Sequence, residues 1–95
     1  MTGKQRSYLK AMANGLATKA QIGKEGISDA VLLQLDQILE AREIVKVHVL
    51  ENCQLSAKEA ANEAAEALKA EFVQSIGRKF VIYRESKDNK TIELP

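Results

Sequence analysis

The stretch Lys19-Ala20-Gln21-Ile22-Gly23-Lys24-Glu25-Gly26-Ile27-Ser28-Asp29 joins a candidate strand to a candidate helix through a G-x-x-G turn. The strand covers residues 19–22, and the glycines at 23 and 26 permit a tight change of direction. Ser28 then suits an N-cap, and Asp29 places an acid in the first helical turn. The stretch predicts a strand–turn–helix unit, the building block of an α/β fold.

A helix is predicted before this unit. Thr2 and Gln5 fit the T-x-x-Q pattern of a capping box, in which each side chain satisfies a backbone amide at a helix start. Apolar spacing extends the helix over residues 3–14, and Asn14-Gly15 is expected to end it in the left-handed conformation. Its apolar stripe is predicted to contain Tyr8, Leu9, Met12 and Leu16.

The helix that begins at Ser28 is predicted to continue through about residue 42. Its acidic neighbours Asp36, Glu40 and Glu43 are expected to face away from the apolar side. The β-branched run from Ile44 to Leu50 predicts a strand, with Val45, Val47 and Val49 on one face and Lys46 and His48 on the other.

The last third of the chain predicts a helix and a hairpin. A second capping box, Ser56 with Glu59, begins an alanine-rich helix over residues 57–70. Two strands, 72–76 and 80–84, are expected to meet at a Gly77-Arg78-Lys79 turn, after which Ile92 and Leu94 dock the tail back on the body. The order α-β-α-β-α-β-β predicts an α/β single-domain sandwich over residues 1–95, with a mixed four-stranded sheet and three helices.

Charge is distributed unevenly along the chain. The 95 residues carry a net charge of +1, yet residues 1–24 hold Lys4, Arg6, Lys10, Lys19 and Lys24 without an acid. Most acids lie between Glu25 and Glu71. This asymmetry favours a molecule with one basic face, and scattered solubilising charge is the alternative.

Composition narrows the function classes further. No stretch has the roughly 20 apolar residues of a membrane span, and no apolar segment follows the basic start as in a secretion signal. Cys53 is the only cysteine, which excludes a disulfide framework and suits a cytoplasmic protein. His48 and Cys53 lack a partner that would make either catalytic, and no metal-ligand spacing occurs. We therefore expect a non-enzyme that uses no cofactor, metal or small-molecule substrate.

The G-x-x-G turn is the strongest candidate site. Its glycines bring backbone amides close to a phosphate, the following helix adds a favourable dipole, and Lys24 adds a cation. Arg78 and Lys79 and the first helix could extend it. Glu25 would oppose phosphate binding only if its carboxylate pointed inward. The few aromatics, Tyr8, Phe72, Phe80 and Tyr83, are more typical of a core than of base stacking. An ordinary charged turn is the alternative.

These residues together resemble the CRM domain (chloroplast RNA splicing and ribosome maturation) in its small bacterial YhbY-like form. The resemblance rests on an ordered set of segments: Met1–Gln5, Gln21–Gly26, Ile44–Val47, Phe72–Gly77 and Val81–Arg84. It implies a sheet and helices arranged as in the C-terminal domain of translation initiation factor three. Two departures are Glu25, where a small or neutral residue is expected, and the segment 14–19, which lacks the family's histidine and proline.

The resemblance also implies RNA binding, with large-ribosomal-subunit precursors as the partner. The family's loop maps to Gly23, Lys24, Glu25 and Gly26, and its basic surface to Lys4, Arg6, Lys10, Arg78 and Lys79. We expect a monomer that binds ribosomal RNA and assists large-subunit assembly. The rival hypothesis is a protein-interaction module that contacts a ribosomal protein or assembly factor without touching RNA.

Overall fold

The computed structural model describes all residues from Met1 to Pro95. The predicted order of three helices and four strands is confirmed: α1 (Gly3–Ala13), β1 (Ala20–Ile22), α2 (Asp29–Arg42), β2 (Ile44–Val49), α3 (Ala57–Leu68), β3 (Glu71–Ile76) and β4 (Lys79–Tyr83). The strands form one sheet in the order β1-β2-β4-β3. β1 pairs parallel to β2, whereas β4 pairs antiparallel to both β2 and β3, so the sheet is mixed as predicted.

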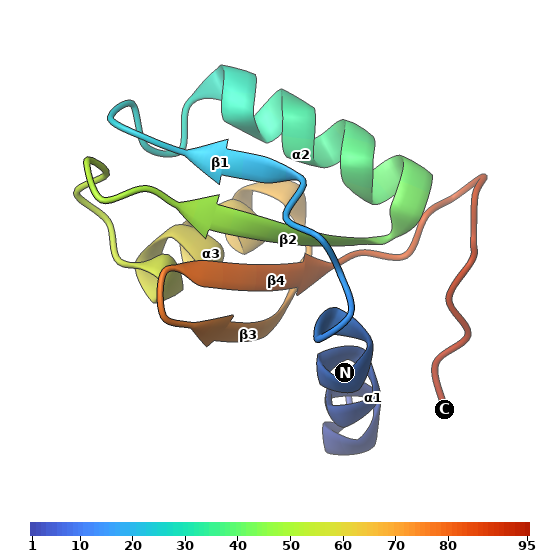
Figure 1. The fold of residues 1–95 in the computed structure, drawn as a ribbon. Coiled ribbons are helices and arrows are strands. Elements are labelled where there is room, and N and C mark those ends of the chain that lie inside the picture. Colours follow the sequence, from blue (N-terminus) through green and yellow to red (C-terminus); the bar gives the residue numbers. More distant parts are fainter.

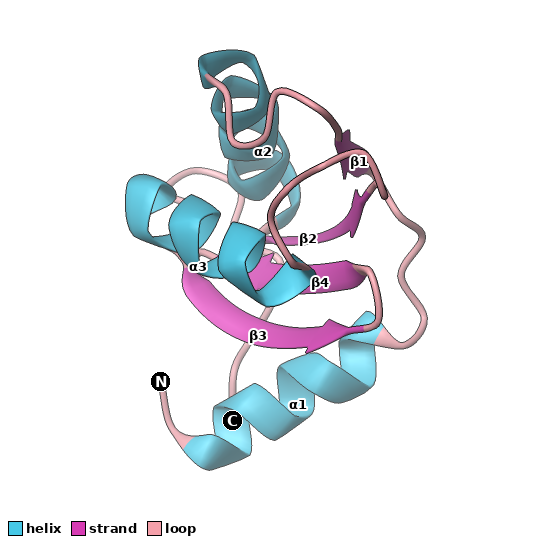
Figure 2. Cartoon of the chain, turned by 90° about the vertical axis from the view of Figure 1, so that its left-hand side faces the viewer, coloured by secondary structure: helices cyan, strands magenta, loops and turns pink.

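The sheet separates two apolar clusters. On one face, α2 and α3 pack on Val45, Val47 and Val49, and the small alanines of α3 let that helix approach closely. On the other face, α1 and the C-terminal tail cover only part of the sheet, over a smaller cluster that contains Leu9 and Ile92 (Figures 1 and 2). Lys46 and His48 are half-buried on this second, partly open face.

The predicted N-terminal caps are confirmed. Thr2 and Ser56 form complete capping boxes, and Ser28 caps α2. The left-handed end of α1 was a wrong prediction, because Asn14 has φ −61° and ψ −27° and Gly15 has no positive φ. The backbone N–H of Gly15 instead donates to the carbonyl of Met12, so the helix end is satisfied without a left-handed residue.

The apolar stripe of α1 is narrower than predicted. Tyr8 is 44% exposed, whereas Leu9 and Ala13 are fully buried. Met12 and Leu16 are partly buried against the same cluster. The helix presents one strip to a sheet face that it only partly covers, and Tyr8 lies outside that strip. The other aromatics agree with the prediction, since Phe80 and Tyr83 are buried and Phe72 packs on the main cluster.

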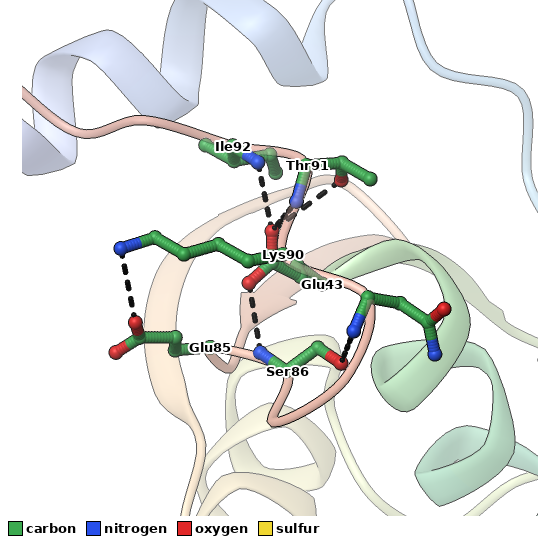
Figure 3. A network of polar contacts seen from close by, with 7 residues as sticks. Glu43, Glu85, Ser86, Lys90, Thr91 and Ile92 are labelled. Carbon is green, nitrogen blue, oxygen red and sulfur yellow. Dashed lines mark hydrogen bonds and ion pairs between the residues drawn. The ribbon is translucent and has the colours of Figure 1, made fainter.

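Glu43 was predicted to face outward and is instead fully buried. It is not a helical residue but the C-cap of α2, with φ 69°, so its side chain leaves the line of the helix. Its carboxylate accepts backbone hydrogen bonds from Ser86 (2.7 Å), Thr91 (2.6 Å) and Ile92 (2.8 Å) (Figure 3). These bonds hold the C-terminal tail against the body and bury Ile92, which confirms the predicted docking of the tail.

Candidate nucleic-acid interface

Three connections meet at one end of the sheet. The parallel strands β1 and β2 both finish there, and the turn between β3 and β4 lies beside them (Figure 1). The backbone N–H of Leu50 donates to the carbonyl of Ile22 (2.8 Å), and that of Val49 donates to the carbonyl of Arg78 (2.7 Å). We call residues 23–28, 50–56 and 77–78 together the loop end.

The G-x-x-G turn has a defined backbone geometry. Gly26 has φ +66°, a conformation that disfavours side chains, and its N–H donates to the carbonyl of Gly23 (3.0 Å). A Cβ at Gly23 would lie 3.5 Å from Oδ1 of Asn52, an ordinary contact. The backbone conformation therefore favours glycine at position 26, whereas position 23 has room for a Cβ.

The charged side chains of this turn face solvent. Lys24 and Glu25 are both exposed, and neither takes part in an ion pair. Directly after the turn, the hydroxyl of Ser28 accepts from the N–H of Val31 (3.2 Å) and caps α2. A free cation thus lies next to a helix N-terminus, two features that attract phosphate, and the exposed carboxylates of Glu25 and Asp29 beside them oppose it.

Arg78 anchors the loop end. Its Nε donates to the carbonyl of Val49 (3.0 Å), and a terminal nitrogen donates to the carbonyl of Leu50. These bonds fix the hairpin turn against the connection that flanks Gly23. Two of the nitrogens of the Arg78 guanidinium therefore donate within the fold, and the group carries five N–H donors in total.

Lys79 is the first residue of β4 rather than part of the turn, and it is exposed. It pairs with His48 of β2, which pairs with Gln21 of β1. The three side chains form a polar row across the open face of the sheet. The sequence pattern predicted that His48 shares a strand face with Lys46, and the structure confirms it, but the pattern did not show that Gln21 and Lys79 lie beside His48.

The cations of α1 lie at the opposite edge of the sheet from the G-x-x-G turn. Nε of Arg6 donates to the carbonyl of Phe72 in β3 (3.2 Å). Arg6 and Lys10 line a hollow of about 550 Å³ along β3 together with Lys58, which sequence reasoning missed inside an acidic helix. Lys4 is exposed and lies outside this hollow.

The structure thus divides the predicted site residues into two groups. With the strand order β1-β2-β4-β3, three strand spacings of about 4.8 Å each separate the two edges of the sheet, and Lys79 lies between them. The exposed acids of α3, Glu59, Glu63 and Glu66, belong to the layer on the other side of the sheet. Cations therefore lie at both edges of the sheet, while these carboxylates belong to the α3 layer.

The shifted pKa values belong to structural groups. Burial alone would raise the pKa of Glu43, but the backbone N–H groups of Ser86, Thr91 and Ile92 outweigh it and lower the pKa. Hydrogen bonds from Ser56 lower the pKa of Glu59 in its capping box. No group of three or more His, Cys, Asp and Glu residues could hold a metal ion, and Cys53 is buried. None of the three helices has the length and apolar character of a membrane span.

Comparison with known proteins identifies the class. Residues 1–84 match the model of the CRS1 / YhbY (CRM) domain, so the chain belongs to this family. It is 42% identical to the probable RNA-binding protein YqeI of Bacillus subtilis, covering 100% of this chain and 99% of that protein. An RNA-binding protein of Haemophilus influenzae is 32% identical, over 100% and 95% of the two chains.

A solved structure shows the same fold. The hypothetical protein SAV1595 from Staphylococcus aureus, solved in solution, superposes with a TM-score of 0.83 and is 50% identical. The match covers 100% of this chain and 99% of that one. The predicted family and fold are therefore both confirmed.

Proposed function

We propose that this protein binds RNA, with ribosomal RNA in precursors of the large subunit as its target. Membership of the CRM family and the RNA-binding names of its relatives support the general function. The single observation that carries the proposal is the loop end, where Lys24 is exposed beside the N-terminus of α2 and Arg78 holds the neighbouring connection in place.

The proposed contacts are to the phosphate backbone. The Gly23–Gly26 turn supplies backbone amides and Lys24, while Lys79 and the α1 cations Lys4, Arg6 and Lys10 extend the basic surface toward β3. Because phosphate contacts position an RNA without reading its bases, this surface favours shape and charge recognition. The strands offer no exposed aromatic side chain on the open face for stacking, since Tyr83 is buried, and the exposed ring of Tyr8 belongs to α1.

The ribosomal target is tested by sedimentation of the tagged protein in a lysate gradient at low salt. We expect co-migration with large-subunit precursors, lost after RNase treatment or at high salt. Lys24→Glu should move the protein to the top of the gradient, whereas Lys87→Glu, the same change at an exposed tail residue, should not. A complex that survives RNase would contradict the proposal and favour a protein-interaction module.

A further inference from the structure

Three hollows adjoin along the edge of the sheet formed by β1, and Lys19 lines all of them. The first, of about 580 Å³, lies over Gln21, His48 and Lys79. The second, of about 330 Å³, and the third, of about 350 Å³, both add Arg42, and the second adds Lys46. We call this surface the β1 track.

No carboxylate lines the β1 track, although the chain contains 13 acidic residues. Its four cations are Lys19, Arg42, Lys46 and Lys79. None of these side chains makes a hydrogen bond or an ion pair within the molecule, whereas Arg6, Arg78 and Arg84 all do. The helix dipole favours Arg42 in the last turn of α2, but it does not explain Lys19 or Lys46. Four unpaired cations without an acid make a surface complementary to a polyanion.

The track continues directly from the G-x-x-G turn. β1 is an edge strand of three residues, and four residues at about 3.3 Å each separate Lys19 from Gly23. A chain held at Lys24 can therefore reach Lys19 along the strand. Gln21, Gln34 and His48 add polar groups that can bond to sugars or base edges.

The lining chemistry of the first hollow favours RNA over an acidic protein partner. Only one of the seven residues around this hollow is hydrophobic, compared with two of six around the third and seven of eleven around the second. Protein interfaces carry an apolar core inside a polar rim, whereas nucleic-acid interfaces are more polar and strongly positive. The lining of the first hollow therefore resembles a nucleic-acid interface.

We infer that the β1 track is a second RNA-contact surface, which takes the single-stranded backbone that leaves the G-x-x-G turn, with Lys19 and Lys46 as phosphate contacts. This inference rests on the proposed function and extends its footprint to residues that lie outside the loop. A G-x-x-G loop alone clamps about four nucleotides, so a strand that occupies both surfaces must be longer.

The test measures binding of fluorescein-labelled single-stranded RNAs of random sequence, 6 and 12 nucleotides long, to the full chain. Lys19→Gln with Lys46→Gln should weaken 12-mer binding at least tenfold at low salt and leave 6-mer binding within twofold. Neutralising two contacts should also reduce the slope of log affinity against log salt by about 1.4, because each single-strand contact contributes about 0.7. The control, Lys69→Gln with Lys87→Gln, removes the same charge from exposed positions outside the track. It should change neither the affinity for the 12-mer nor the salt slope.

A folded Lys19/Lys46 variant that binds the 12-mer with wild-type affinity and salt slope would overturn the inference alone. Wild-type protein that binds neither RNA would overturn the proposed function as well. Competition with a 12-residue oligoglutamate separates the two kinds of partner. If it displaced the 12-mer at an equal concentration, the track would belong to an acidic protein, and the inference would be wrong.

Discussion

The carboxylate of Glu43 accepts a hydrogen bond of 2.8 Å from the backbone N–H of Ile92, 49 residues further along the chain. Two more backbone amides, those of Ser86 and Thr91, donate to the same carboxylate. The group is fully buried and has no cationic partner. Its charge is stabilised by these amides and by the hydroxyl of Thr91, which also donates to it (3.3 Å), and through these bonds it fixes the tail that covers the cluster beneath α1.

Replacing this carboxylate should destabilise the fold. Glu43→Gln presents an NH₂ group where amides now donate, so we expect a loss of about 1–3 kcal/mol in the free energy of unfolding. Urea denaturation measures it. Glu63→Gln, the same change at an exposed position on α3, should leave the midpoint where it is. Equal midpoints for the two variants would contradict the role assigned to Glu43.

Stability should also fall in acid. Hydrogen bonds, from Ser86 to Glu40 and from Ser56 to Glu59, lower the pKa of these carboxyls below the ordinary 4.5, and the pKa of Glu43 is lowered as well. Because the folded-state pKa values lie below the unfolded ones, this stabilisation is complete above 4.5 and is lost as the pH falls through the folded values. Urea midpoints from pH 7 down to pH 3 should show the decline. The urea midpoint of Glu43→Gln should decline less steeply as the pH falls. A decline as steep as that of the wild type would contradict the role of Glu43 in this pH dependence.

The two glycines of the turn should respond differently to alanine. Gly26 has φ +66°, so Gly26→Ala introduces a left-handed alanine and should cost about 1–2 kcal/mol. Gly23 has no positive φ, and its new Cβ would make only ordinary contacts, so Gly23→Ala should be nearly neutral. Thermal unfolding compares them. A Gly26→Ala protein as stable as Gly23→Ala would show that the turn is not held in the observed geometry.

Arg78 and Lys79 are neighbours of the same charge with different roles. Arg78→Gln removes two bonds to the carbonyls of Val49 and Leu50 and should lower the free energy of unfolding by about 1–3 kcal/mol. Lys79 makes no such bond, so Lys79→Gln should leave stability unchanged and reduce the salt slope of RNA binding by about 0.7. Calorimetry and binding titration separate the effects. The reverse pattern would contradict the roles given to both residues.

Much of this fold could be predicted from local patterns. Helix caps are one example, because a capping side chain and the backbone amide that it accepts from lie three residues apart. Thr2, Ser28 and Ser56 were identified in this way, and all three cap their helices. The burial of Glu43 could not be read from its helix, because its partners lie more than forty residues away in the tail. The exposure of Tyr8 likewise depends on how much of the sheet α1 covers.

In the candidate site, too, local features could be predicted from the sequence, whereas features that depend on long-range packing could not. The Gly23–Gly26 turn follows from a local motif, and the structure places it between β1 and α2 as expected. The separation of Arg6 and Lys10 from that turn follows from the strand order, which brings β3 to the far edge of the sheet. The charge pattern along the chain indicated one basic face, but it could not show that the cations lie at both edges of the sheet.

The most direct test of the central claim is titration of the full chain with purified large-subunit ribosomal RNA at several salt concentrations. The account predicts binding whose log affinity falls linearly with log salt, and Lys24→Glu should weaken that binding at least tenfold while Lys87→Glu leaves it unchanged. Absence of binding at low salt, or an affinity that does not respond to salt, would contradict it.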